Sequence, residues 1–169
     1  MCDPFGGRED LARGVVRAVG EPLRRFGEDA LRILRLYRFA ARFGFAIDEA
    51  TEAAAKQLAS HLDCVSAERI EEELNKLLAA PQPGVYLEPE VLAFVLPELP
   101  PEELTKARRR IDALPAGTEQ VSARWAALLL PLGETGARKA LKRLKCSNAR
   151  IDGLSLIHIS EPTRPISIS

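Results

Sequence analysis

The fold of this chain is decided by the stretch RFGEDALRILRLYRFAARFGF, which runs from Arg25 to Phe45. At about 100° per residue, its apolar residues gather on one side of a helix and its arginines fall within a band about 120° wide on the other. Glu28 lies inside that band, and Gly44 stands where a glycine commonly ends a helix. The stretch therefore predicts one amphipathic helix. Its buried face is Ala30, Ile33, Leu34, Tyr37, Ala40 and Ala41, and its charged band is Arg32, Arg35, Arg38 and Arg42.

Two acidic residues, Glu28 and Asp29, stand near the start of this helix. Their charges suit the positive end of the helix dipole, and both have a spacing to Arg32 at which side chains on a helix meet. On pattern alone, such a band is typical of a solvated face whose surface ion pairs each contribute about 0 to 1 kcal/mol. The charges by themselves therefore do not establish a function.

Composition indicates a globular protein with no general affinity for nucleic acid. Of the 169 residues, 46% are hydrophobic and 28% charged, as in soluble domains. The 24 lysines and arginines balance the 24 acidic residues, so any contact with RNA must come from local patches. Cys2, Cys64 and Cys146 fit neither a disulfide framework nor a zinc cluster, which favours the reducing cytoplasm. We expect no secretory signal and no membrane association.

The segment before the central helix predicts a short strand. Asp3 to Gly7 has the composition of a turn, Arg8 to Ala12 allows one or two helical turns, and the β-branched run from Gly14 to Gly20 favours a strand. A lone strand leaves its backbone groups unpaired, and no later segment offers a convincing partner. We therefore expect the rest of the sheet to lie before Met1, in a chain truncated at its N-terminus.

From Asp48 onward the pattern is helical, which predicts a mainly α fold with a compact helical array. Asp48 and Ser66 are expected N-caps, and Ser147 is a candidate cap for a further helix. Trp125 is expected in the core, and His61 to be merely structural. The predicted helices cover residues 49–61, 67–79, 90–96, 101–113, 119–130 and 134–145.

Beyond about Leu154 the helical period is lost and Ile alternates with Ser. This run resembles the translation of a sequencing adaptor fused to an incomplete gene. We therefore treat residues 154–169 as a non-native tail and give His158 no functional weight.

The arrangement Glu-Asp-x-x-Arg-x-x-Arg-x-x-Arg-Phe from Glu28 to Phe39 resembles a motif of the class II tRNA nucleotidyltransferases. This family comprises the CCA-adding enzymes and the bacterial poly(A) polymerases. Further likeness lies in the segment from Asp3 to Pro22, in Val65 to Ile70 with Glu73 and Leu74, and more weakly in the later helices. The resemblance implies four parts: residues 1–24 as the end of an α/β nucleotidyltransferase head and a hinge, 25–83 as a neck, 84–153 as a tRNA-binding helical body, and 154–169 as the tail.

The resemblance also implies that the motif helix selects CTP and ATP. Cytosine and adenine both present an amine donor beside a ring-nitrogen acceptor, which a carboxylate at Asp29 and a guanidinium at Arg32 match. Uracil and guanine invert this pattern. Arg35 and Arg38 are then expected at the triphosphate or bracing the selecting pair, and Glu28 is expected to orient Arg32.

Catalysis in this family needs residues that the chain lacks. The family's head carries a glycine-rich signature and an Asp-x-Asp pair that holds Mg²⁺, and no Asp-x-Asp occurs in this sequence. Because two-metal nucleotidyl transfer needs carboxylates at the metals, we expect Mg²⁺ to be bound by the missing head. The fragment alone is expected to bind nucleotide weakly and to be inactive.

A second basic patch lies on the helix predicted from Glu134. Taken alone, it also fits a solvated face. The resemblance implies contacts with tRNA phosphates there. The residues expected to bind tRNA are Arg138, Lys139, Lys142, Arg143 and Lys145.

Three functions stay open at this point. The first is a piece of a CCA-adding enzyme, for which tRNA, ATP and CTP are the expected partners. The second is a piece of a bacterial poly(A) polymerase, which shares the motif helix but adds only A. The third is a non-catalytic helical RNA-binding adaptor. The pattern does not distinguish addition of CCA from addition of C or A alone.

Overall fold

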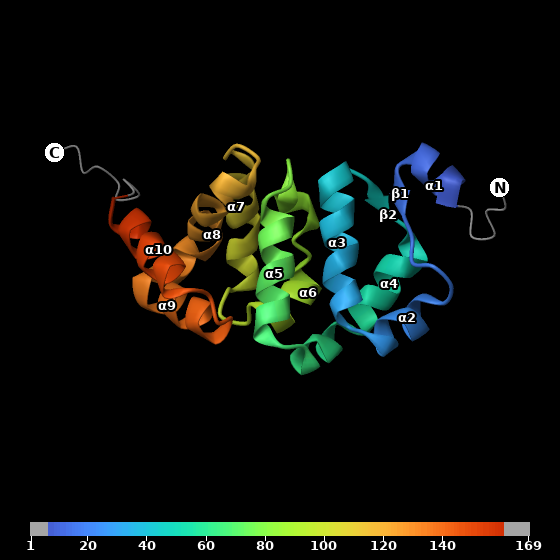
Figure 1. Ribbon diagram of the computed structural model, residues 1–169, viewed down its shortest axis with the longest axis horizontal. Coiled ribbons are helices and arrows are strands. Elements are labelled where there is room, and N and C mark those ends of the chain that lie inside the picture. The colour runs from blue at the N-terminus through green and yellow to red at the C-terminus, as the bar shows by residue number, and fades with distance from the viewer. Residues whose placement is uncertain (1–6, 161–169) are drawn as a thin grey trace.

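The computed structural model describes residues 7–160, with side chains placed as far as Leu154. Within that range the chain forms a row of packed helices with one small pair of strands, and it runs along the row from α1 to α10 (Figure 1). The predicted mainly α fold with a small α/β remnant at the N-terminal end is confirmed. The elements are α1 Gly7–Arg13, β1 Val15–Val16, α2 Pro22–Glu28, α3 Leu31–Phe43, β2 Ala46–Ile47, α4 Glu49–Gln57, α5 Ala67–Leu78, α6 Pro89–Val95, α7 Pro101–Asp112, α8 Val121–Leu129, α9 Gly133–Arg143 and α10 Asn148–Ser160, with short 3₁₀ helices η1 Ala59–Cys64, η2 Pro83–Tyr86, η3 Thr118–Gln120 and η4 Leu130–Leu132.

The prediction of a single helix through Arg25–Phe45 is wrong, because the chain breaks at Asp29. Asp29 is extended, with φ −152° and ψ 104°, and separates α2 from α3. Its Oδ1 accepts a hydrogen bond from the backbone N–H of Leu31 at 3.1 Å, at the start of α3. A short acidic side chain competes with the helical backbone in this way, so it ends one helix and starts the next. Gly44 ends α3 in the left-handed conformation with φ 66°, as predicted.

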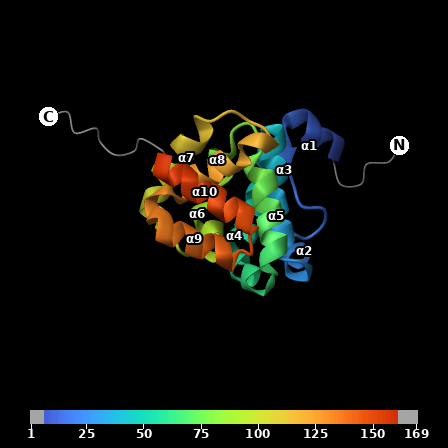
Figure 2. The same ribbon diagram turned by 60° about the vertical axis from the view of Figure 1, so that its left-hand side comes forward.

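Helix α3 packs its apolar face on α5, and both views show the two helices side by side (Figures 1 and 2). Every residue predicted for the buried face of α3 is buried, and Leu31 and Leu36 join them. Ile70, Leu74, Leu77 and Leu78 form the matching apolar stripe of α5. Burial of each such side chain contributes about 1.5 to 3 kcal/mol.

The expectation that no later segment pairs with this strand is wrong. Strand β1 pairs in parallel with β2, with Val15 opposite Ala46 and Val16 opposite Ile47. The N–H of Ala46 donates to the carbonyl of Gly14, and the N–H of Asp48 to that of Val16, both at 2.9 Å. The partner is only two residues long and follows α3 directly, so it has no strand pattern of its own. The turn predicted at residues 3–7 lies mostly outside the described residues.

The helix caps were predicted with mixed success. Asp48 caps α4, because its side chain accepts from the N–H of Thr51 at 3.0 Å. Ser147 Oγ accepts from the N–H of Arg150 at 3.3 Å at the start of α10. Helix α5 starts after Ser66 as predicted, but the Ser66 side chain makes no capping bond. The helix predicted over residues 49–61 ends at Gln57 and is followed by η1.

In the C-terminal half, two buried side chains of α8 tie α8 to the neighbouring elements. Trp125 is in the core as predicted, fully buried, and its indole N–H donates to Asn75 Oδ1 at 2.7 Å. The equally buried Arg124 donates to the carbonyls of Leu78 at 2.5 Å and Leu114 at 2.9 Å, at the ends of α5 and α7. The end of α5 is thereby fixed by a residue 46 positions later.

Helix α10 continues to Ser160, past the point where the sequence loses its helical period. The origin of residues 154–169 and the four-part division of the chain stay predictions. Among the helices of the described range, none combines the length and apolar character needed to cross a bilayer.

Candidate nucleotide and RNA site

The junction between α2 and α3 places Glu28 against Arg32. Arg32 Nη1 donates to Glu28 Oε2 at 2.9 Å and to the carbonyl of Arg25 at 3.0 Å. The hydrogen bond from Arg32 holds the pKa of Glu28 below its usual value. The ion pair gives Glu28 the geometry needed to orient Arg32, and the orienting role stays a prediction.

Asp29 does not pair with Arg32, so the contact predicted from helical spacing is wrong. The break at Asp29 takes its side chain off the helical path, and Oδ1 is used at the start of α3. Oδ2 faces Arg69 Nη2 of α5 at 3.4 Å. The Asp29 carboxylate and the Arg32 guanidinium are both partly exposed, at 27% and 32% of their side-chain areas. One acceptor and one donor are thus presented at the same end of α3, each held by its own neighbour.

Arg35 and Arg38 share one buried carboxylate on α5. Arg35 Nε lies 3.2 Å from Glu73 Oε1, and Arg38 Nε lies 3.0 Å from Glu73 Oε2. Glu73 is only 4% exposed, whereas Arg35 is 43% exposed and Arg38 18%. The carboxylate therefore fixes two arginines of the motif from inside the protein, and they keep part of their surface outside.

The sequence assigned no role to Glu73, although it contained a signal. Glu73 lies at the i+3 position of the apolar stripe that Ile70, Leu74 and Leu77 define on α5. An acidic residue on the inner side of a helix needs a buried partner. Arg69 had no comparable signal, because its contact with Asp29 depends on how α3 and α5 meet.

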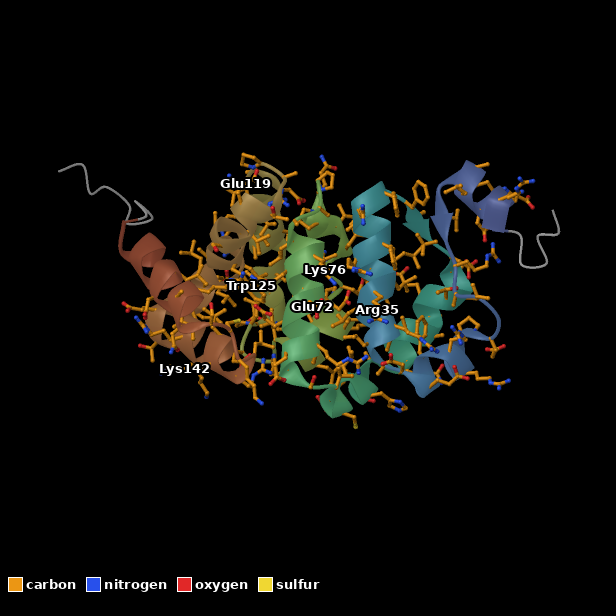
Figure 3. The ribbon with its side chains drawn as sticks, in the orientation of Figure 1. Arg35, Glu72, Lys76, Glu119, Trp125 and Lys142 are labelled. Atoms are coloured by element: carbon orange, nitrogen blue, oxygen red, sulfur yellow. The ribbon has the colours of Figure 1, made fainter. Side chains whose placement is uncertain are left out.

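Three consecutive acids of α5 pair with partners on α3, on α10 and on α5 itself. Glu73 binds α3, Glu71 lies 2.5 Å from Arg150 Nη1 of α10, and Glu72 pairs with Lys76 of its own helix at 2.9 Å. Successive residues point about 100° apart on a helix, so one short run reaches three directions. Figure 3 shows Glu72 and Lys76 on α5 facing Arg35 on α3.

The basic patch of α9 is largely engaged within the protein. Arg143 Nε lies 2.5 Å from Glu98 Oε1, and its Nη2 donates to the carbonyl of Val95 at 2.8 Å. Arg138 pairs weakly with Glu134 at 3.4 Å and Asp152 at 3.5 Å, and Lys145 lies 3.1 Å from Glu68. Lys139 and Lys142 are exposed, and neither makes an ion pair with any described residue. Figure 3 shows Lys142 at the outer side of α9. The tRNA-binding role of the five residues stays a prediction.

A metal ion finds no ready site here. Within residues 7–154, no group of three or more His, Cys, Asp or Glu side chains is placed to hold one.

Comparison with known proteins places these features in a family. Residues 44–101 match the family described as the probable RNA and SrmB-binding site of polymerase A. That range begins at the end of α3 and includes α5 with Glu73.

The CCA-adding enzyme of Geobacillus stearothermophilus is 38% identical over 173 aligned positions, which cover 98% of this chain and 42% of that enzyme. The crystal structure of the Bacillus stearothermophilus CCA-adding enzyme in complex with CTP has a TM-score of 0.75 at 34% identity, over 94% of this chain and 40% of that one. The Thermotoga maritima CCA-adding enzyme complexed with tRNA has a TM-score of 0.68 at 25% identity, over 95% and 42% of the two chains. The chain thus spans about two fifths of the length of the relatives that it matches.

Proposed function

Because this chain belongs to the CCA-adding enzyme family, we propose that its protein is a tRNA nucleotidyltransferase that uses CTP and ATP to build or repair the 3′ CCA end. The relatives solved with CTP and with tRNA support this choice of substrates. The observation that carries the proposal is the start of α3, where Asp29 and Arg32 of the motif present an acceptor and a donor at the same end of the helix. We place the protein in the cytoplasm, where tRNA is matured.

Asp29 and Arg32 read the Watson–Crick edge of the incoming base. The Asp29 carboxylate accepts from the exocyclic amine of cytosine or adenine, and the Arg32 guanidinium donates to the adjacent ring nitrogen. Uracil and guanine would set a carbonyl oxygen against the carboxylate and an N–H against the guanidinium. The protein thus takes the place of a template strand.

The neighbours of this pair hold it ready. Glu28 fixes Arg32, and Arg69 faces the Asp29 oxygen that is not used at the start of α3. Glu73 holds Arg35 and Arg38 one and two turns further along, where their free N–H groups can meet the triphosphate. Preorganised donors of this kind need no rearrangement when the nucleotide arrives.

Two partners of the reaction involve other surfaces. We propose that tRNA phosphates contact the α9 patch, where Lys139 and Lys142 make no ion pair with any described residue. We also propose that Mg²⁺ is held by the Asp-x-Asp pair of the family's head, which the resemblance implies and this sequence lacks. In this proposal the described residues bind and select the nucleotide.

A second candidate function is poly(A) synthesis. The family match over residues 44–101 takes its description from polymerase A, and a reader of the amine and ring nitrogen accepts adenine in either enzyme. The CCA-adding relatives favour the first function. Incorporation of C into a tRNA that ends before its CCA separates the two, because a poly(A) polymerase adds only A.

The test measures incorporation of each of the four nucleotides by the complete protein. Asp29→Ala should relax discrimination against UTP and GTP by about 5- to 150-fold, because each paired contact to a base edge discriminates by about 1 to 3 kcal/mol. Arg35→Ala and Arg38→Ala should weaken the binding of all four nucleoside triphosphates by similar factors. Asp63→Ala, an exposed aspartate on η1, is the matched control and should change nothing. A uniform loss of activity in Asp29→Ala, with UTP still rejected, would overturn the template role.

A further inference from the structure

The second half of α3 carries a repeated Arg–Phe pair, Arg38–Phe39 and Arg42–Phe43. The guanidinium carbon of Arg38 lies 4.4 Å from the centroid of the Phe39 ring, and that of Arg42 lies 5.6 Å from the centroid of Phe43. Phe39 is 41% exposed and Phe43 56% exposed, although α3 is otherwise well packed. Residues four apart share a helix face, so the repeat forms a basic stripe beside an aromatic stripe.

A groove of about 560 Å³ opens beside these stripes, between α3, α5 and the start of α8. Its lining includes apolar residues that directly follow α5, and its charged lining residues are all basic. The lining residues are Arg38, Phe39, Arg42, Asn75, Lys76, Ala79, Ala80, Pro81, Thr118, Val121 and Arg150.

The ion pairs around the groove leave an excess of positive charge. Glu73 is shared by Arg35 and Arg38, Glu72 pairs with Lys76, and Glu71 pairs with Arg150. Arg42 has no acidic partner among residues 7–154. Five cations thus face three carboxylates. Because Glu72 is 64% exposed, its bond to Lys76 is easily exchanged for one to a ligand anion.

We propose that this groove and the Arg–Phe stripes bind a single-stranded RNA end, with bases stacked on Phe39 and Phe43 and phosphates held by Arg42 and Lys76. Aromatic platforms interleaved with cations are how proteins hold single strands, since every base offers a face for stacking. The inference rests on the proposed function and gives the tRNA 3′ strand a place on α3. Arg42 lies ten residues beyond Arg32, about 15 Å along the helix, so the strand lies well away from the pair that reads the base, and Arg38, which lines the groove, lies between them.

Binding to the 169-residue chain itself tests the proposal. The probe is a single-stranded hexaribonucleotide that carries 2-aminopurine. Fluorescence anisotropy measures its binding, and quenching of the 2-aminopurine fluorescence measures stacking of the base. The wild-type chain should bind and quench. Phe39→Leu and Phe43→Leu keep an apolar side chain but remove the ring, and each should weaken binding about fivefold or more and reduce quenching. Phe94→Leu on α6, an exposed phenylalanine outside the groove, is the matched control and should change neither.

The charge is tested by salt dependence. Arg42→Gln should weaken binding and reduce the slope of log K against log salt by about 0.7, the value for one phosphate on a single strand. Lys106→Gln, an exposed lysine on α7, should leave the slope unchanged. Circular dichroism of each variant confirms that it is folded.

Three results would overturn the proposal: no binding by the wild-type chain, binding that the phenylalanine and Arg42 variants do not weaken, or displacement of the RNA by equimolar CTP, which would make the groove a triphosphate site. The proposed function fails separately. Asp29→Ala should leave hexanucleotide binding unchanged, whereas it alters nucleotide selection in the complete protein.

Discussion

The arginines of α3 and the basic residues of α9 follow the same pattern in the sequence, yet they meet different surroundings. On α3, Arg35 and Arg38 converge on Glu73, which is 4% exposed. On α9, Arg138 reaches two exposed carboxylates at 3.4 and 3.5 Å, and Lys142 reaches none among the described residues. A charged stripe becomes part of a rigid site when its partner is buried and stays a solvated surface when it is not. The two helices differ in their acidic partners, because Glu73 on α5 is buried and the partners of Arg138 are exposed.

The largest expected effect follows from removing the buried carboxylate. Glu73→Ala leaves Arg38 and the inner side of Arg35 without a counter-charge, and breaking a buried pair from one side costs about 3 to 5 kcal/mol. Because Arg35 is 43% exposed and can turn to water, we expect the lower end of that range, about 3 kcal/mol. Urea unfolding followed by circular dichroism measures it.

The adjacent residue supplies the control for this prediction. Glu72 has the same chemistry, but it pairs at the surface with Lys76 of its own helix, so Glu72→Ala should leave the midpoint of unfolding nearly unchanged. If the two variants unfold at the same urea concentration, the contrast between a buried and a surface carboxylate on α5 is wrong.

Local sequence patterns predicted many of the buried residues and one helix cap. The buried residues of α3, the burial of Trp125 and the cap at Asp48 depend on spacing within one helix or on a bond to a near neighbour. The break at Asp29 escaped prediction because the Asp29 side chain competes with a helix that every other residue favours. The strand partner escaped because β1 and β2 are two residues each and their paired residues are 31 positions apart.

The contacts of the candidate site also fall into two groups, those that local spacing predicts and those that depend on how the helices pack. The motif residues were predicted from the sequence, and the ion pair between Glu28 and Arg32 follows from i to i+4 spacing. The contacts of Asp29 with Arg69 and of Arg35 with Glu73 join residues about 40 positions apart, so they need the packing of α3 on α5. The groove beside Arg42 needs residues of α3, α5, η3, α8 and α10 to be brought together.

Replacing Arg143 should lower the free energy of unfolding by less than Glu73→Ala does. Its guanidinium holds both oxygens of Glu98 and the carbonyl of Val95, so it ties α9 to the end of α6. Arg143 is 40% exposed, and after solvent screening we expect Arg143→Ala to cost about 1 kcal/mol. Arg138→Ala, which removes two longer and more exposed contacts, is the comparison variant and should cost less. Thermal unfolding of both variants ranks them, and an Arg138 effect equal to that of Arg143 would contradict the structural role of Arg143.

The smallest effect on stability is expected at Lys142, where the effect on RNA should be clearest. Lys142→Ala removes an exposed cation with no ion pair in the described part of the chain, so the unfolding midpoint should not change. If the α9 patch holds tRNA phosphates, the same change should weaken tRNA binding and lower the salt slope by about one unit for each phosphate that Lys142 neutralises. Filter binding of tRNA to the complete protein at several salt concentrations measures that slope, with Lys106→Ala on α7 as the matched control. An unchanged slope would return α9 to a solvated face. Of the two helices, only α3 would then keep a proposed contact with a ligand. Its arginines are the ones that a buried acid holds in place.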